Sequence, residues 1–403
     1  MMDLASAQAR VMAAIAPLAP TSIAPADALG LVLAADVVAA EQVPPFANTA
    51  MDGYAVRAGD TIAAPVELTV VGELPAGYAP TIPVGVGEAI RIMTGAPMPA
   101  GADAIVMVER TEPLAKERVR IQVAARVGDH VRPAGGDVEP GQLVFTAGTR
   151  LRPAHLGVLA SLDVHEVRAY RRPRVGVLST GDELVERGEL APGQIRDSNR
   201  PMLLALAREA GCDPVDLGSA RDDEALITDR IAHALDTCDA LLTSGAVSVG
   251  DYDFVKVAIE KLAAARGGEY TWAQVAIKPA KPLAFGLIGG VPVFGLPGNP
   301  VSSSVSFEMF ARPALRVLAG DPHPQRPHVA TIAAQPFERR PDGKLHLDRV
   351  RVWVGDDGRY RSERSGLQAS NVLSGMANAD GLALLADGDG VAEGDAVTVM
   401  LLG

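Results

Sequence analysis

The sequence predicts a multidomain protein in which a doubly wound α/β domain is flanked by β-rich domains. Its 403 residues exceed the size of one ordinary domain, and 48% of them are hydrophobic, which is enough for several cores. Between residues 173 and 320, apolar strand patterns alternate with amphipathic helix patterns. On both sides of that range the chain shows period-two alternation broken by Pro and Gly. The alternating part predicts a parallel sheet covered by helices.

The predicted domains follow from where these patterns change. They are an N-terminal helix over 1–20, a β-rich linker domain formed by 21–43 and 136–172, a β-rich domain over 44–135, the α/β domain over 173–320, and a C-terminal all-β, barrel-like domain over 327–403. The N-terminal helix is amphipathic, so we expect it to pack on the α/β domain. In the last domain, the Asp357-Gly358 pair predicts a turn between two strands.

Within the α/β domain, each element has its own signal. A buried strand is predicted at RVGVLST, further strands at DPVDLG and DALLTSG, and helices at SNRPMLLALAREAG, DDEALITDRIAHALDT and DFVKVAIEKLAA. Ser198 or Asn199 is expected to cap the first helix. A long helix over 300–319 closes the domain, with Asn299 as its cap and a proline at its first position.

The composition argues against several classes of function. The formal net charge of −12 disfavours nucleic acid as the main partner, because a phosphate backbone needs a basic surface. No apolar run is long enough to span a membrane, and the N-terminus lacks the basic start of a signal peptide. Cys212 and Cys238 lie in apolar surroundings and suit neither a disulfide framework nor a zinc site. We therefore expect a cytoplasmic protein with buried free thiols.

Three segments rich in small residues follow predicted strands. They are STGDEL (179–184), SGAVSVGD (244–251) and GLPGNPVSSS (295–304). Ligands of open α/β sheets bind at the carboxyl ends of the strands, where backbone N–H groups can bind an anion. Three such loops at one edge favour a phosphate-bearing ligand.

The middle segment resembles a phosphate-binding loop but lacks its lysine. Gly245 and Gly250 have the GxxxxG spacing, and Asp251 occupies the lysine position, so this is not a Walker A motif. Asp251 and Asp253 suit Mg²⁺ beside a phosphate. Two structural alternatives stay open, because Asp251 could cap the following helix and Asp253 could interact with the dipole of that helix.

The segment KPAKP is unusual because lysine is rare in this chain. Only six of the 37 basic residues are lysine, and Lys278 and Lys281 lie three positions apart among prolines. Lysine is a compact point charge that suits a small oxyanion, and proline stiffens the backbone that presents it. The alternative is a pair of solvated surface lysines.

The segment PPFANTAMDGYAVR (44–57) places Asp52 in a turn of small residues. An acid between apolar neighbours suits a ligand-binding function. An ordinary Asp-Gly turn explains the same residue types equally well.

Taken together, these segments resemble the molybdopterin molybdenumtransferase family, which includes bacterial MoeA and the E domains of a plant protein and of gephyrin. The resemblance rests on PPFANTAMDGYAVR, RIMTGAPMPAGADAIVMVE, STGDEL, SGAVSVGDYDF, KPAKPLAFG and GLPGNPVSSSVSFE in the order of the family. It implies an L-shaped homodimer with four domains per chain, one of them MogA-like. It also implies a reaction in which molybdate joins the dithiolene of adenylylated molybdopterin, with Mg²⁺ as cofactor and release of AMP.

The resemblance assigns functions to individual residues. The expected catalytic residues are Asp52, Glu183, Asp223, Asp253, Lys278 and Lys281, with Asp222 an equal alternative to Asp223. Mg²⁺ would be bound by Asp52, Glu183 and Asp253. The molybdate pocket would contain the two lysines together with Ser302 or Ser303, Arg349 and Ser370. Further substrate contacts are expected from Thr94, Asp137, Ser244, Gly245, Ser248, Gly250, Pro297 and Asn299.

Two positions depart from the usual family pattern. Gly245 is followed by Ala246 where the family has a second glycine, and Ala280 replaces the glycine of KPGKP. Either position is a candidate for positive φ, which alanine tolerates poorly.

Two other functions are compatible with parts of the sequence. The α/β domain alone suggests a molybdopterin adenylyltransferase that consumes ATP, and a non-catalytic pterin-binding scaffold is the other alternative. The β-rich domains and the paired lysines favour molybdate transfer, with a separate adenylating protein as a possible partner.

Overall fold

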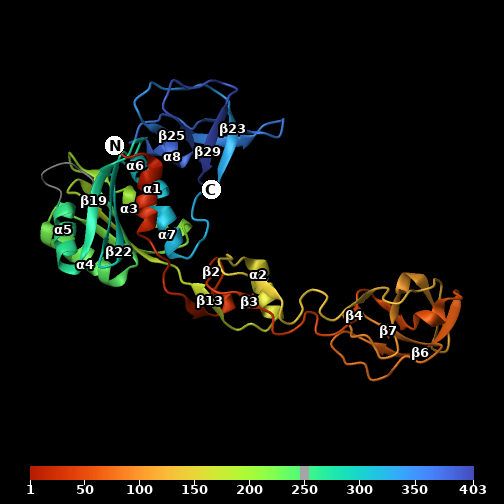
Figure 1. Cartoon of the computed structure of the whole chain (residues 1–403). Helices are drawn as coiled ribbons and strands as arrows, with labels where there is room; N and C mark the ends of the chain where they lie inside the picture. The colour runs from red at the N-terminus through yellow and green to blue at the C-terminus, as the bar shows by residue number, and fades with distance from the viewer. Residues whose placement is uncertain (246–253) are drawn as a thin grey trace. The chain divides into compact units, whose positions relative to one another are not determined.

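The computed structural model describes residues 1–245 and 254–403, which form two compact units (Figure 1). The larger unit consists of residues 1–21, 30–34 and 168–403. The smaller unit consists of residues 22–29 and 35–167. Each unit is described by itself below.

The α/β part of the larger unit is built on a six-stranded sheet in the order β17-β14-β18-β22-β21-β19. Its parallel strands are β14 (Arg174–Thr180), β17 (Asp213–Ala220), β18 (Ala240–Ser244) and β22 (Val291–Leu296). The antiparallel strands are β19 (Gly268–Gln274) and β21 (Pro282–Ile288). The predicted fold class is confirmed, including the mainly parallel sheet.

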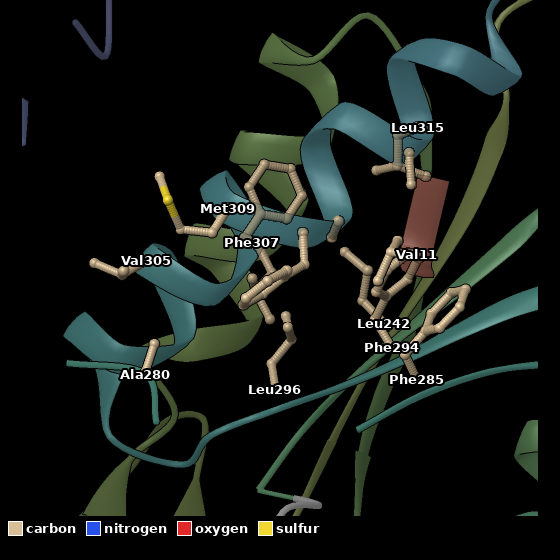
Figure 2. Packing of buried hydrophobic residues seen from close by; sticks show 14 of the residues in the cluster. Val11, Leu242, Ala280, Phe285, Phe294, Leu296, Val305, Phe307, Met309 and Leu315 are labelled. Carbon is tan, nitrogen blue, oxygen red and sulfur yellow. The ribbon is translucent and has the colours of Figure 1, made fainter. Parts of the chain in front are cut away.

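Helices cover both faces of this sheet. Figure 1 shows α4 (Glu224–Thr237) and α5 (Phe254–Arg266) on one face, and α1 (Leu4–Ala13) and α3 (Asn199–Glu209) on the other. Two separate hydrophobic cores fill the two interfaces. The larger core brings Val11 of α1 against side chains of the sheet, including Phe294 and Leu242 (Figure 2). Burial of these apolar stripes is what holds the helices on the sheet.

The connections around β14 create a topological switch point. The chain runs from β14 through α3 to β17 on one side, and then returns through α4 to β18 on the other side of β14. The strand order therefore reverses between β14 and β18, which is where open α/β sheets form their ligand crevice.

The closing helical segment is interrupted in the middle. The predicted helix over 300–319 is present as α6 (Pro300–Ser306), a π-helical turn η4 (Phe307–Ala311) and α7 (Arg312–Leu318). Pro313 has no N–H to donate to the carbonyl of Met309. The Nε2 group of Gln8 in α1 donates to that carbonyl at 3.0 Å instead. The N-terminal helix thus satisfies an acceptor that the proline leaves open.

The C-terminal part of the larger unit is a closed barrel of five strands. They are β23 (His328–Ala333), β25 (Leu345–Val354), β26 (Tyr360–Arg364), β27 (Gly381–Leu385) and β29 (Ala396–Leu401). The predicted turn at Asp357-Gly358 joins β25 to β26, and Gly358 has a φ of 75°. A short strand from the α/β part, β20 (Ile277–Lys278), pairs with β25 and so connects the sheet to the barrel.

The smaller unit has a six-stranded sheet of its own in the order β8-β5-β7-β6-β10-β9. Its strands are β5 (Gly53–Val56), β6 (Val66–Leu74), β7 (Glu88–Ile92), β8 (Ala104–Met107), β9 (Thr111–Leu114) and β10 (Arg118–Ile121). Beside it, β4 (Asn48–Thr49) pairs with β11 (Val131–Arg132), and β3 (Val37–Val38) pairs with β12 (Leu143–Phe145). One α-helix, α2 (Pro153–Ser161), belongs to this unit, together with three short 3₁₀ helices, η1 (Pro25–Asp27), η2 (Ala58–Thr61) and η3 (Val108–Arg110).

The remaining elements are short. They are β1 (Thr21–Ile23), β2 (Val32–Leu33), β13 (Val167–Tyr170), β15 (Leu184–Val185), β16 (Ile195–Arg196), β24 (Phe337–Glu338), β28 (Gly390–Val391) and α8 (Leu373–Ala377). Both cysteines are buried free thiols, and burial raises the pKa of Cys212 to about 12. Across the described residues, no helix combines the length and apolar character needed to cross a membrane.

Candidate functional site

The three small-residue segments that follow strands share one edge of the α/β sheet. β14, β18 and β22 are parallel neighbours, so their carboxyl ends lie together. The Thr180 hydroxyl donates to the Ser244 carbonyl at 3.4 Å, and the Gly245 N–H donates to the Leu296 carbonyl at 3.2 Å. The expected crevice is therefore bordered by the ends of all three strands.

Glycine is required where β18 ends. Gly245 has a φ of 95°, and a Cβ atom there would lie 2.7 Å from the carbonyl oxygen of Thr180. The chain also passes close to the loop after β22, since a Cβ atom on Gly298 would lie 3.8 Å from the Gly245 Cα. Of the predicted loop residues, Ser248, Gly250, Asp251 and Asp253 lie outside the described residues, as does Ala246.

Asn199 is a buried residue at this edge that the sequence patterns did not indicate as a ligand-binding residue. Its Nδ2 group donates to the Ser244 hydroxyl and to the Gly298 carbonyl, both at 2.7 Å. Asn199 is the first residue of α3, and Ser198 takes the N-cap position without a side-chain hydrogen bond. The sequence signal was the Ser198-Asn199 pair, which we interpreted only as a helix cap.

The acids near this edge differ in how they are used. Asp223 caps α4, because its Oδ1 accepts a hydrogen bond from the Leu226 N–H at 2.8 Å. Asp222 donates its own N–H to the Asp182 carboxylate at 3.2 Å, and its own carboxylate accepts no hydrogen bond from a described residue. Glu183 is exposed, and its carboxylate would lie 2.4 Å from a Cβ atom on Gly181. The capping role of Asp223 makes Asp222 the freer of the two alternatives.

The KPAKP segment forms a closed turn between the sheet and the barrel. The Val275 N–H donates to the Lys281 carbonyl at 2.7 Å, and Lys278 is paired with His346 of β25. Both lysine side chains are exposed. Ala280 has a φ of 69°, so the positive φ considered for this position is confirmed. An L-residue in that conformation costs about 1–2 kcal/mol.

A cavity of about 570 Å³ lies beside this turn. Lys278 contributes to its wall, and so do Arg364, Leu367 and Gln368 of the barrel. The last two residues also bind Arg349, since the Leu367 carbonyl accepts from its Nη2 at 2.6 Å and the Gln368 Oε1 accepts from its backbone N–H at 2.8 Å. The segment that lines the lysine cavity is thus the segment that holds Arg349.

Arg349 is a fully buried cation, and some of its hydrogen-bond donors have no partner among the described residues. Its exposed fraction is 0%, and Nη2 donates to the carbonyls of Leu367 and Ala369. Its Nε and Nη1 groups are buried without a hydrogen-bond partner among the described residues. Burial lowers the pKa of Arg349, which the charge of Asp348 partly offsets. Asp348 is itself bonded to Arg364 at 2.8 Å.

The predicted serines lie next to the segment that binds Arg349. The Val301 N–H at the start of α6 donates to the carbonyl of Ser370 at 3.1 Å, and Ser370 follows Ala369 directly. Ser302 and Ser303 are buried in α6, and the Ser303 hydroxyl has no hydrogen-bond partner among the described residues. The structure therefore brings α6, Ser370 and Arg349 into one neighbourhood.

Two further predicted residues precede α6. Pro297 is buried after β22, and Asn299 occupies the N-cap position of α6 as expected. The Asn299 side chain makes no capping hydrogen bond, whereas its carbonyl accepts from the Ser303 N–H at 2.9 Å. The helix starts on Pro300 and does not use the asparagine side chain.

The smaller unit holds a separate pair of predicted residues. Asp52 accepts hydrogen bonds from the N–H and the hydroxyl of Thr94, both at 2.7 Å. These two bonds hold the pKa of Asp52 below its ordinary value although the carboxylate is exposed. Asp137 is exposed in the same unit, and its N–H donates to the Val43 carbonyl. Within residues 1–245 and 254–403, no three acidic, histidine or cysteine side chains are grouped to hold a metal.

Three family profiles match consecutive parts of the sequence. Residues 2–162 match the MoeA N-terminal region (domain I and II), residues 176–317 match a probable molybdopterin binding domain, and residues 337–402 match the MoeA C-terminal region (domain IV). The chain is 43% identical to molybdopterin molybdenumtransferase 2 of Mycobacterium tuberculosis over 90% of each chain. It is 36% identical to molybdopterin molybdenumtransferase of Haemophilus influenzae, covering 93% of this chain and 91% of the other.

Solved structures agree with these sequence relatives. A molybdopterin biosynthesis moeA protein from Pyrococcus horikoshii matches with a TM-score of 0.80 and 31% identity, covering 100% of this chain and 99% of the other. A second crystal structure of a moeA protein from the same organism matches with a TM-score of 0.83 and 27% identity over the whole of both chains.

Proposed function

The chain belongs to the molybdopterin molybdenumtransferase family and is an enzyme of molybdenum cofactor biosynthesis, and on that premise we propose that it joins molybdate to adenylylated molybdopterin and releases AMP. Molybdate and adenylylated molybdopterin are the proposed substrates. The proposal also includes a cytoplasmic location, a homodimer, and a separate adenylating protein that supplies the pterin.

The buried guanidinium of Arg349 is the observation that carries this proposal. A buried cation with two unsatisfied donors is costly unless an anion completes its hydrogen bonds. Cδ lies between the N–H bonds of Nε and Nη1, so these donors point in different directions, and each can give a charge-assisted hydrogen bond to an oxygen of a tetrahedral oxyanion. Molybdate is an oxyanion of this kind.

Neighbouring groups support the same ligand. The Ser303 hydroxyl is a second buried group without a described partner, and Ser370 lies one residue from a carbonyl that binds Arg349. Lys278 belongs to the adjoining cavity, where its ammonium group would attract an anion from solvent. We propose that these residues, with Lys281 and Ser302, bind molybdate.

The adenylyl group is proposed to bind at the edge where β14, β18 and β22 end. Ser244, Gly245, Pro297 and Asn299 border that edge, and backbone N–H groups in such loops favour phosphate. Ser248 and Gly250 belong to the same proposal but lie outside the described residues. Release of AMP needs charge neutralisation and positioning and no strong general base.

Mg²⁺ is proposed as the cofactor that neutralises this phosphate. Of its proposed ligands, Glu183 is an exposed carboxylate of the larger unit, Asp52 belongs to the smaller unit, and Asp253 lies outside the described residues. Carboxylate oxygens are the ligands that Mg²⁺ prefers. Thr94 would orient Asp52, whereas Asp137 and Asp222 or Asp223 are proposed as further polar contacts.

The reaction itself provides the test. The purified protein is incubated with adenylylated molybdopterin, molybdate and Mg²⁺, and AMP release and metal incorporation are both measured. We expect the two to occur together and to stop when molybdate or Mg²⁺ is omitted. Consumption of ATP with free molybdopterin would instead identify an adenylyltransferase, and pterin binding without AMP release would identify a scaffold.

A further inference from the structure

Asn199 lies at the topological switch point of the sheet. It begins the helix that follows β14, and its Nδ2 group reaches the end of β18 at Ser244 and the loop after β22 at Gly298, with both donor–acceptor distances 2.7 Å. One side chain therefore connects three segments that are far apart in sequence. The crevice of an open α/β sheet forms at this point.

The amide oxygen of Asn199 takes no part in these two hydrogen bonds. The side chain is 8% exposed, and its Oδ1 atom has no hydrogen-bond partner among the described residues. A flip of the amide does not remove the problem, because the Gly298 carbonyl can only accept and so requires the NH₂ group. A buried acceptor without a partner destabilises the protein, so a donor from a ligand would recover this free energy.

We propose that Asn199 binds the nucleotide part of the substrate. Its NH₂ group sets the separation between the loops at Ser244 and Gly298, and its Oδ1 atom accepts a hydrogen bond from a ribose hydroxyl. This inference rests on the proposed function, because that function places a nucleotide phosphate at this edge of the sheet.

The chemistry of the ligand selects the ribose. Oδ1 can only accept, so neither phosphate nor molybdate oxygens can be its partner. On a nucleotide, the sugar that carries the phosphate also carries hydroxyl groups, which are the donors nearest to that phosphate. An acceptor placed beside a phosphate loop therefore distinguishes a ribonucleotide from a deoxynucleotide.

The segment before Asn199 is held firmly in place. The Asp197 side chain accepts hydrogen bonds from the Ser179 hydroxyl at 3.3 Å and from the Arg200 backbone N–H at 3.1 Å. It also accepts from the Arg200 guanidinium at 3.2 Å, and only 3% of it is exposed. These contacts fix the start of α3 against β14, so the amide is oriented before a ligand arrives.

Calorimetry with three nucleotides tests the proposal on the unmodified protein. AMP, 2′-deoxyAMP and 3′-deoxyAMP are titrated in the presence of Mg²⁺. We expect at least one deoxynucleotide to bind about three- to tenfold more weakly than AMP, the range of one neutral hydrogen bond. Equal affinities for all three nucleotides would overturn the contact and leave the proposed function standing, whereas absence of any AMP binding would overturn both.

Two variants distinguish the contact of Oδ1 with the ribose from the link that Nδ2 makes between the loops at Ser244 and Gly298. Asn199→Ala removes Oδ1 and should abolish the preference for AMP. Ser244→Ala removes one partner of Nδ2 but leaves Oδ1. It should therefore weaken the binding of all three nucleotides and preserve the preference for AMP. Molybdate binding and the thermal melting curve report whether each variant is folded. A preference for AMP that survives in folded Asn199→Ala would disprove the assignment.

Discussion

Two buried arginines in the larger unit behave in opposite ways. Arg316 in α7 is 8% exposed, and its guanidinium binds the Asp321 carboxylate and the Ala210 carbonyl. Arg349 in β25 is 0% exposed, binds only carbonyls among the described groups, and keeps two donors unused. The two side chains have the same charge and nearly the same burial. They differ in whether the fold supplies a carboxylate that accepts hydrogen bonds from the guanidinium.

This difference separates a structural charge from a ligand-binding charge. A buried ion pair that is complete within the chain carries no information about ligands, because its hydrogen bonds are already used. A buried cation whose donors lack partners points to an anion that is not part of the chain.

The largest effect, on the stability of the fold, is expected for the ion pair of Arg316 and Asp321. Arg316→Leu would leave Asp321 without its cation in a site where the carboxylate is 10% exposed. Such a loss costs about 3–5 kcal/mol, so the free energy of unfolding, measured by urea denaturation, should fall by that amount. Adding Asp321→Asn removes the uncompensated charge and should recover part of the loss. A variant as stable as the wild type would remove the contrast between the two arginines.

For Arg349, whose donors lack described partners, we expect a large effect on ligand affinity and a small effect on stability. Arg349→Met should reduce molybdate affinity about hundredfold, because charge-assisted hydrogen bonds contribute up to about 3 kcal/mol. Stability should change by less than about 1 kcal/mol, since loss of two hydrogen bonds to carbonyls is offset by removal of a buried charge. Calorimetry with molybdate and urea denaturation measure the two quantities. Wild-type molybdate affinity in the folded variant would contradict the proposed pocket.

Exposed cations should matter less than the buried one. Lys278→Ala and Lys281→Ala are each expected to weaken molybdate binding about tenfold, the lower end of the same range, because solvent screens both ammonium groups. Lys344→Ala is a matched control, since that lysine is bonded to Asp342 at 3.0 Å. At high salt, the molybdate affinities of the lysine variants should approach that of the wild type, whereas the affinity of Arg349→Met should stay lower. An effect of Lys344→Ala as large as that of Lys278→Ala would show that only general surface charge is involved.

The smallest effect concerns the acid of the smaller unit, whose partners are also supplied by the chain. Thr94→Val removes one of the two hydrogen bonds to Asp52, so the pKa of that carboxyl should rise towards its ordinary value. The folded-state pKa is depressed, so the stability from this group is present above the unfolded pKa. It is lost as the pH falls from the unfolded pKa through the folded pKa, and in the variant the loss should be smaller and complete at a higher pH. An NMR titration of the Asp52 carboxyl measures the shift. An unchanged pKa would mean that the Thr94 hydroxyl does not contribute to the depression, which would leave the Thr94 backbone N–H and the charge of Arg91 as its causes.

Local sequence patterns determined the architecture. The change from period-two to helical spacing near residue 173 predicted the α/β sheet, and the Asp357-Gly358 pair predicted a turn of the barrel. The three small-residue segments predicted which edge of the sheet would carry a ligand crevice. These signals can be read from the sequence because side-chain periodicity records which face of each element is buried.

Only the tertiary structure decided which polar groups are satisfied. Asn199 binds the Gly298 carbonyl, which lies 99 positions further along the sequence. The two carbonyls that bind the Arg349 guanidinium lie 18 and 20 positions from that residue. Asp223 turned out to cap a helix, which its position beside Asp222 could not distinguish. Whether a buried donor or acceptor has a partner depends on neighbours that the fold brings from elsewhere in the chain, and no local pattern records them. The residue types of the proposed site were therefore identifiable in the sequence, whereas the buried groups without a described partner, on which the proposed ligands rest, were found only in the folded structure.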